Sequence, residues 1–409
     1  MVSLAPARLC HKARGLAGYD WEHDASTYEC GGFGRCCHAR HRSQGARRLR
    51  DRPDGSADRA RGLDQCAAGR RAAYIDRVNA AGGINGKPVK LRILDDQADA
   101  QKAAANVRQL LAQDNAILLI DSSLSSTYAP VIAEAKHADV PLMFVGAVCP
   151  KEVYPPAESG QFCTSAFASN LDSSAALSFI KSTATDRVRL GLAGMTIPIS
   201  RAEVNFAEGQ ASTLGMTVVD KEIIPPATTD YAPFATKLKA AKPNWVYAWA
   251  PWVTQLRTYE ALRGLGWQGS FLTWAHQEAE DELKRRKDPE LYVIGANALF
   301  QDGMPVQKEI AAAVAKAGSE SAASQMTEGW IGGLVIEAAL KQAGSPAAAA
   351  TLTTALENLK VDVKGLRGGP IEWTKDNHYR LRQSYRIYKW DAAKGQIVLA
   401  KDWFGYQVN

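Results

Sequence analysis

From residue 70 onward the sequence alternates short apolar runs with longer helix-like stretches, and this alternation limits the possible folds more than any other feature. The runs 116–121 (AILLID), 140–146 (VPLMFVG) and 245–250 (WVYAWA) place aliphatic and aromatic residues at successive positions, as strands buried on both faces do. Strands that alternate with helices form βαβ units. The sequence therefore predicts parallel sheets in an α/β fold.

The predicted elements form two series of the same design. The first series comprises a helix over 72–81 that ends at Gly82 and Gly83, a strand over 88–96, a helix over 98–112, a strand over 116–121, a helix after Ser125 and Ser126, and a strand over 140–146. The second comprises helices over 174–182, 204–214, 231–241 and 254–266, and strands over 187–194, 216–224, 245–250 and 270–274. Two such doubly wound domains enclose a cleft, and ligands bind there at the carboxyl ends of the strands.

After Gly303 the chain is predicted to be mainly helical, with helices over 305–318, 328–344 and about 351–359. Two alternating runs then predict a terminal hairpin, namely 384–390 (SYRIYKW) and 397–403 (IVLAKDW). No repeat with a short fixed period is present, so a solenoid is not expected.

The first 70 residues differ in composition from the rest. They hold 13 Lys or Arg against 8 Asp or Glu and five of the seven Cys, but only one Val and no Ile. Because no aliphatic periodicity recurs in them, we expect residues 1–69 to be disordered or misread coding sequence. No secretory signal is legible there, since a signal needs an apolar run of about 7 to 15 residues. A zinc site is a weaker alternative for this segment. Its candidate ligands lack the paired CxxC and HxxxH spacings of known zinc sites, and these candidates are Cys30, Cys36, Cys37, His38 and His41.

Charge and motifs exclude several classes of function. After residue 70 the chain carries 36 Lys or Arg against 35 Asp or Glu, which offers little attraction to a nucleic acid. No apolar run approaches the roughly 18 to 20 residues that cross a bilayer, so membrane insertion is not expected. The sequence has no P-loop, GxSxG or HExxH motif. We therefore expect no enzyme, no cofactor and no metal site.

Several runs carry a resemblance to a known family. Residues 78–111 (VNAAGGINGKPVKLRILDDQADAQKAAANVRQLL) and 122–147 (SSLSSTYAPVIAEAKHADVPLMFVGA) resemble the first domain of the branched-chain amino acid binding proteins that serve ABC transporters. Residues 228–249 and 369–380 are similar to later segments of the same family. The resemblance covers residues 70–409, and the run VNAAGGINGK is its most specific part.

The resemblance implies a type I periplasmic binding protein, in which the chain crosses three times between two α/β domains. The first domain would comprise residues 70–165 and 300–380, and the second 166–299 and 381–409. The crossings would lie near 164–168, 298–303 and 379–384. Family members begin with a strand and a glycine-rich loop, and neither is legible before residue 70.

The resemblance also implies a function. The expected protein captures a small carboxylate ligand in the periplasm and presents it to the membrane permease of an ABC importer. A cytoplasmic ligand sensor of the same fold, as in amide-responsive regulators, is the alternative.

Hydroxyl groups mark the expected ligand site on the first domain. Ser123, Ser125 and Ser126 follow the strand over 116–121, where the N–H groups of a helix start could also hold a carboxylate. A serine at such a position can instead only cap the helix. The resemblance favours ligand contact, and it adds the backbone around Ala147 to the site. Family members often have Ser or Thr where this chain has Val148.

Aromatic residues mark the expected site on the second domain. Trp249 and Trp252 follow the strand over 245–250, and Trp274 ends the strand over 270–274. Their rings could grip an apolar or aromatic ligand, although ordinary core packing accounts for most tryptophans.

Amino-acid binders of the family place an acidic residue shortly after the strand equivalent to 270–274. This chain has Ala275 and His276 there, with Glu278 slightly later. His276 is therefore a candidate ligand contact, and an α-ammonium group would lack its usual partner. We expect a branched or aromatic acid rather than leucine.

Cys149 and Cys163 stand apart from the other cysteines. In an oxidising compartment they could form a disulfide, and two free buried thiols are the alternative.

Overall fold

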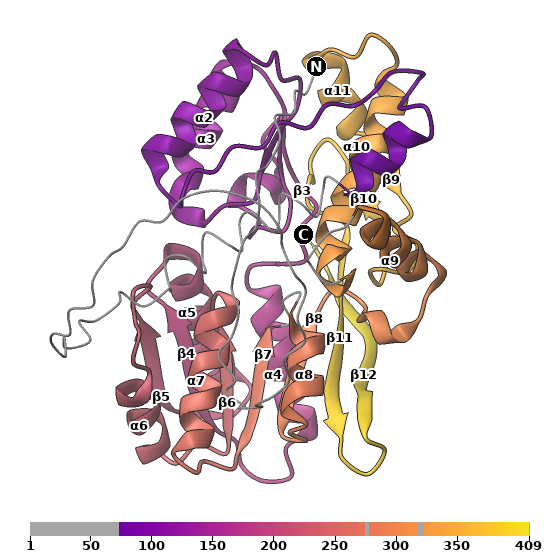
Figure 1. Ribbon diagram of the computed structural model, residues 1–409. Coiled ribbons are helices and arrows are strands. Elements are labelled where there is room, and N and C mark those ends of the chain that lie inside the picture. Colours follow the sequence, from indigo (N-terminus) through magenta and orange to yellow (C-terminus); the bar gives the residue numbers. More distant parts are fainter. Residues whose placement is uncertain (1–72, 275–277, 318–322, 409) are drawn as a thin grey trace, which may run out of the picture.

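The computed structural model describes residues 73–274, 278–317 and 323–408. In these ranges the chain forms two lobes, and each lobe contains a parallel sheet with helices packed against it (Figure 1). No helix in the described ranges is long and apolar enough to cross a membrane.

The first lobe is built on a small parallel sheet. Its strands, in spatial order, are β1 (Leu119–Asp121), β2 (Leu142–Phe144) and β3 (Gln161–Cys163). The N-terminal part of the lobe adds a helix over 73–80, α2 (Ala100–Ala112), η1 (Ser125–Thr127), α3 (Tyr128–His137) and η2 (Lys151–Val153). A later part of the chain adds α9 (Pro305–Ala317), η4 (Ala323–Met326), α10 (Thr327–Ala343), α11 (Ala349–Leu356) and the antiparallel pair β9 (Lys360–Val361) and β10 (Ile371–Glu372).

Strand β2 carries core residues on both faces. Leu142 and Phe144 pack in one apolar cluster with residues of α2 and α3. Met143 and Val145 pack in a second cluster with residues of α10. A run that is apolar at every position is therefore a fully buried strand here.

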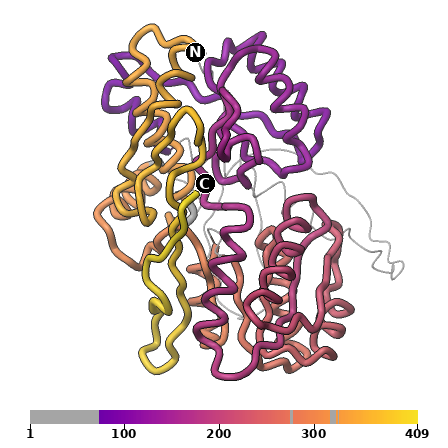
Figure 2. Tube along the Cα trace, turned by 180° about the vertical axis from the view of Figure 1, so that it is seen from behind, coloured from indigo at the N-terminus to yellow at the C-terminus, as the bar shows by residue number. Residues whose placement is uncertain are grey.

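The second lobe is built on a seven-stranded sheet with the order β12-β11-β8-β7-β6-β4-β5. Its parallel strands are β4 (Arg189–Met195), β5 (Thr217–Ile224), β6 (Trp245–Trp249), β7 (Ser270–Trp274) and β8 (Leu291–Gly295). The accompanying helices are α4 (Leu171–Thr183), α5 (Pro198–Thr213), α6 (Ala232–Ala240), α7 (Trp252–Gly264) and α8 (Ala279–Arg286). The predicted hairpin, β11 (Arg382–Asp391) and β12 (Gln396–Gln407), adds antiparallel strands beside β8, along the edge of the lobe (Figure 2).

The strand order of this sheet fixes where a crevice can open. The chain passes from β4 to β5 on one side and then returns to β6 on the other side of β4. Such a switch point leaves a crevice outside the carboxyl ends of the two central strands. The cavity between the two lobes differs from this rule, because its second-lobe residues belong to β7, α8 and the segment after β8 rather than to the ends of β4 and β6.

The predicted α/β class, with two doubly wound domains and three crossings, is confirmed. The prediction of a strand over 88–96 is wrong. Among the described residues this segment pairs with no other strand, and β1 pairs only with β2. The backbone N–H and C=O of Val89 are instead bonded to the Asn79 side chain. Strands β3 and β8 and helix α8 have no counterpart among the predicted elements.

One buried arginine joins two of the crossings. Arg367 donates from Nη1 to the carbonyl oxygen of Thr164 on the first crossing and from Nε to Oδ1 of Asn297 on the second, at 2.8 Å. Its Nη2 lies 2.6 Å from Oε1 of Glu328, in the first turn of α10. A second arginine, Arg380 on the third crossing, donates to the carbonyl oxygen of Ser165. The three crossings thus form one bonded junction.

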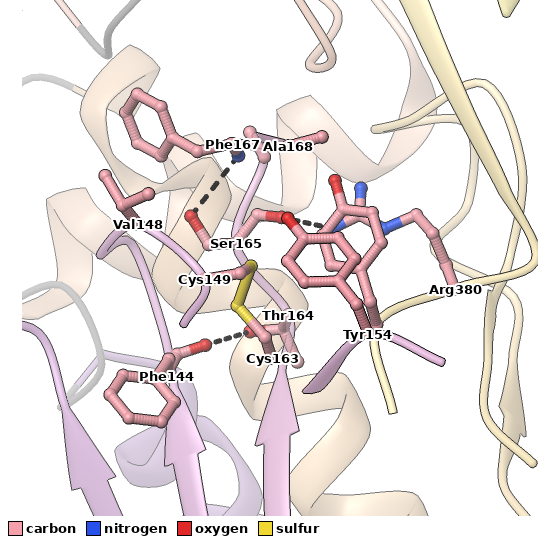
Figure 3. Close-up of a disulfide and its surroundings, with 12 residues drawn as sticks. Phe144, Val148, Cys149, Tyr154, Cys163, Thr164, Ser165, Phe167, Ala168 and Arg380 are labelled. Carbon is pink, nitrogen blue, oxygen red and sulfur yellow. Dashed lines mark hydrogen bonds between the residues drawn. A yellow bond between two sulfur atoms is a disulfide. The ribbon is translucent and has the colours of Figure 1, made fainter. Parts of the chain in front are cut away.

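A disulfide fixes the loop after β2 to this junction. Cys149 and Cys163 are joined, with their Cα atoms 5.8 Å apart and both side chains fully buried. Figure 3 shows the bond between the loop and β3, with Thr164, Ser165 and Arg380 beside it. Because β3 leads directly into the first crossing, the bond limits how far the loop can move from it.

Two buried carboxylic acids lie where the first crossing enters α4. Asp172 accepts hydrogen bonds from Tyr385 Oη at 2.8 Å and Trp249 Nε1 at 3.1 Å. Glu203 of α5 accepts from the backbone N–H groups of Asn170 and Ser173 at the start of α4, at 2.7 and 3.0 Å. Burial and then repulsion from Glu203 hold the pKa of Asp172 well above its usual range, and burial also raises the pKa of Glu203.

The disulfide leads to a prediction about covalent state and stability. Unfolding the oxidised protein in denaturant with an alkylating agent and no reductant should leave Cys149 and Cys163 unmodified, and non-reducing peptide mapping should recover them linked. Replacing both by alanine should lower the free energy of unfolding by about 3 kcal/mol, since the open loop regains entropy when unfolded. Alkylation of both thiols in the unreduced protein would contradict the bond.

The acid pair leads to a prediction about pH. A carboxyl whose folded pKa is raised binds more protons folded than unfolded, so the free energy of unfolding should fall as pH rises from about 4 through the raised pKa. Asp172→Asn should flatten this fall in denaturant titrations between about pH 4.5 and 8. Asp362→Asn is the control, because Asp362 is exposed and its lowered pKa keeps it ionised throughout this window. An unchanged slope in Asp172→Asn would contradict the prediction.

Candidate functional site

The carboxyl ends of the strands in both lobes meet at a cleft between the lobes. A cavity of about 50 Å³ lies there, and both lobes and the first two crossings contribute to its wall. The lining residues are Gly146, Ala166, Phe167, Trp274, Glu280, Asn297, Ala298, Leu299, Phe300, Ser324, Thr327 and Glu328. A second contact between the lobes joins η1 of the first lobe to α5 of the second, and neither element lines the described cavity.

The three candidate serines follow β1 but have different surroundings. Ser123 donates from Oγ to Asp96 Oδ1 at 3.1 Å, and its backbone N–H donates to the Asp121 carboxylate. Ser126 is exposed. Ser125 is half-buried, and its Oγ is shielded from solvent and has no hydrogen-bond partner.

Ser125 does not act as a helix cap in this structure. The N-cap residues are Leu124 for η1 and Thr127 for α3, and neither makes a side-chain cap hydrogen bond. The capping alternative considered for Ser125 therefore does not explain its position. A shielded hydroxyl without a hydrogen-bond partner typically lowers the stability of the folded state by about 1 to 3 kcal/mol. A ligand or water that bonds to this hydroxyl would remove that cost.

The loop after β2 approaches the cavity from the first lobe. Gly146 lines the cavity and has a left-handed backbone with φ of 71°, a conformation that favours glycine. Ala147 follows it and is buried. Val148, which replaces the family's hydroxyl residue, packs against the core of the second lobe. The Val148 side chain therefore contributes to contact between the lobes rather than to hydrogen bonding.

The three candidate tryptophans are all buried but lie in different places. Trp249 packs in one core cluster of the second lobe, and its indole N–H is bonded to Asp172. Trp252 packs in the cluster on the other face of the sheet. Trp274 lines the cavity, where its ring lies 5.4 Å from that of Phe167. Among the three, only Trp274 is part of the described cavity wall.

Some sequence-based candidates lie outside the described residues. These are His276, its neighbour Ala275, and the weaker zinc candidates Cys30, Cys36, Cys37, His38 and His41. Within the described ranges no three His, Cys, Asp or Glu side chains gather as metal ligands would.

Sequence reasoning missed the acidic residues of the cavity wall. Glu328 is 4% exposed and paired with Arg367, and Glu280 is 3% exposed and lies 2.6 Å from Lys284 Nζ. A signal for Glu328 did exist, because it is a lone acid at the start of the apolar stretch EGWIGGLV. For Glu280 the signal was hidden, since it stands in the highly charged segment EAEDELKRR.

The comparisons with known proteins agree with this architecture. A sequence profile described as periplasmic binding protein matches residues 63–396, which begins near the composition break at residue 70. A search of curated proteins found no match.

Several solved structures share the fold. A branched-chain amino acid ABC transporter protein from Thermus thermophilus with bound valine has a TM-score of 0.74 at 14% identity, covering 85% of this chain and 93% of that chain. A fatty acid ABC transporter substrate-binding protein from Thermomonospora curvata has 0.70 at 18%, covering 86% and 92%. An extracellular ligand-binding receptor from Rhodopseudomonas palustris HaA2 has 0.69 at 22%, covering 84% and 96%.

At these identities the structural likeness shows the fold, and the family assignment rests on the profile match over most of the chain. The two lobes, the three crossings and the cleft between them are the features that such a family requires. This chain belongs to the periplasmic binding protein family.

Proposed function

We propose that this protein is the solute-binding receptor of an ABC importer of the branched-chain amino acid type. It captures a small carboxylate ligand in the cleft and presents it to a membrane permease. The family match and the fold support this function, and the similar structures include ABC transporter proteins for branched-chain amino acids and fatty acids.

The observation that carries the proposal is the shielded hydroxyl of Ser125. It lies in η1, which contacts α5 of the second lobe, and it has no hydrogen-bond partner within residues 73–274, 278–317 and 323–408. The N–H groups that open a helical turn also lack partners within the helix. A ligand carboxylate at this position would accept hydrogen bonds from both kinds of donor. Further along the cleft, the backbone around Ala147 supplies the next contact.

Closure of the lobes provides the signal for the permease. A ligand shifts a two-state equilibrium only by its difference in affinity for the two states. A carboxylate held by the first lobe and an apolar body packed on the second make that difference, because both contacts exist only when the lobes are closed. Of the candidate aromatic contacts, Trp274 is supported best, since it lines the cavity beside Phe167. Trp249 and Trp252 would act as supports of the wall.

The buried disulfide supports the periplasmic receptor over the cytoplasmic sensor. Disulfides persist in oxidising compartments such as the periplasm and are rare in the cytosol. The bond between Cys149 and Cys163 also limits movement of the loop that carries Ala147. A cytoplasmic sensor would have to keep this loop in place without the bond.

Removing the Ser125 hydroxyl should reduce ligand affinity. Losing a hydrogen bond to a charged group costs about 1.5 to 3 kcal/mol, so Ser125→Ala should weaken carboxylate binding roughly 10- to 150-fold. Isothermal titration calorimetry on the full chain, with leucine, isocaproate, phenylalanine, phenylpropanoate and their amides, measures this directly. We expect the acids without an amino group to bind and the amides not to bind.

Ser212→Ala is the matched control, because Ser212 is an exposed serine on α5 that bonds only to its own helix. It should leave both affinity and stability unchanged. Binding of amides but of no carboxylate would reject the receptor proposal in favour of the amide-type sensor. Tight binding of leucine with no binding of isocaproate would reject the preference for a ligand without an amino group.

A further inference from the structure

Glu328 uses only one of its two carboxylate oxygens within the protein. Its Oε1 accepts from Arg367 Nη2 at 2.6 Å and from Asn297 Nδ2. Its Oε2 is shielded from solvent and has no hydrogen-bond partner among the described residues, although Glu328 lines the cavity. A carboxylate oxygen in this state is an acceptor that lacks a donor.

Trp274 presents the complementary group from the other lobe. The residue is 1% exposed and lines the same cavity, and its indole Nε1–H has no hydrogen-bond partner in the part of the chain that the structure describes. An indole nitrogen can only donate. Buried tryptophan N–H groups usually find an acceptor, as those of Trp249 and Trp267 do here. Two residues that line the cavity therefore each carry an unused polar group, a donor on Trp274 of the second lobe and an acceptor on Glu328 of the first.

The charges around the cavity balance. Glu328 is paired with Arg367, and Glu280 is paired with Lys284. Neither carboxylate thus brings an uncompensated negative charge to the cavity. A ligand ammonium would have to leave water without gaining a net opposite charge, which is unfavourable in a buried site. A neutral polar group has no such cost.

We propose that this cavity recognises a hydroxyl group of the ligand, so that the transported solutes are small hydroxy acids. The inference rests on the proposed receptor function and narrows its ligand class. A hydroxyl donates one hydrogen bond and accepts others, so a single group satisfies both Glu328 Oε2 and Trp274 Nε1. An ammonium group satisfies Glu328 only, and a methylene satisfies neither.

The position of the cavity fits the rest of the proposed ligand. Gly146 lines it, and Ala147, a proposed carboxylate contact, is the next residue. In an α-hydroxy acid the hydroxyl oxygen is two bonds from the carboxyl carbon. A carboxylate held at Ala147 would therefore bring the hydroxyl close to the cavity. The cavity volume of about 50 Å³ suits a small polar substituent rather than a whole side chain. A bound water could fill the cavity instead of a ligand hydroxyl. The two cases are distinguishable, because only recognition of a ligand hydroxyl makes the hydroxy acid bind more tightly than the acid without the hydroxyl.

The test compares three ligands that differ at one position: leucine, its α-hydroxy analogue and isocaproate. Isothermal titration calorimetry on the full chain should show the hydroxy acid binding on the order of 10- to 100-fold more tightly than isocaproate. Trp274→Phe should reduce that ratio about 10-fold by weakening only the hydroxy acid, because phenylalanine keeps the ring but lacks the donor. Glu328→Gln should also reduce the ratio.

Two controls separate recognition from folding. Trp267→Phe removes an indole donor that is bonded to Pro243 O, and Glu337→Gln neutralises a half-buried acid of α10 that is paired with Lys341; none of these residues lines the cavity. Both should leave the ratio unchanged. Thermal melting followed by circular dichroism identifies any variant that fails to fold. If Glu328→Gln does not fold, the affinity ratio of Trp274→Phe alone tests the hydroxyl inference. Equal binding of hydroxy acid and isocaproate overturns the hydroxyl inference but leaves the receptor function standing, whereas no binding of any acid overturns both.

Discussion

The contacts of Arg367 hold the crossing segments of this protein together, and the cleft depends on them. One guanidinium bonds to Thr164, Asn297 and Glu328, so it links the first crossing, the second crossing and the first lobe. The group is buried, and removing one partner would leave a charge without compensation, which typically costs about 3 to 5 kcal/mol. The relative placement of the two sheets therefore depends on a few buried polar bonds, together with apolar contacts such as that of Val148 with the core of the second lobe.

The same junction reaches the ligand cavity through Glu328. One oxygen of this carboxylate belongs to the junction and the other has no partner. A ligand that bonds to the second oxygen would act on the residue that also holds the crossings. The residue that lines the cavity is therefore also part of the junction between the crossings. The disulfide keeps the neighbouring loop at a fixed position relative to the first crossing.

The candidate site was predictable where the chemistry is local. Ser125 could be proposed from the sequence because hydroxyls that follow a buried strand stand at the carboxyl edge of a sheet, wherever that sheet lies. Trp249, Trp252 and Trp274 could not be separated in the same way. All three lie at or just beyond strand ends, but whether an indole meets a carboxylate, a core or a cavity depends on segments far away in the sequence. Asp172, for example, lies 77 positions from Trp249.

The sequence by itself determined the α/β class, most helices and strands, and the family resemblance, because apolar periodicity and turn residues act over a few positions. It could not determine whether residues 88–96 form a strand, since a strand exists only with a ladder partner. The sequence also could not show that Glu328 lines a cavity. Those features were decided by the tertiary structure, because burial and hydrogen bonding depend on which distant segments are brought together. In this fold, the crossings bring residues from five separate stretches of chain to one cavity.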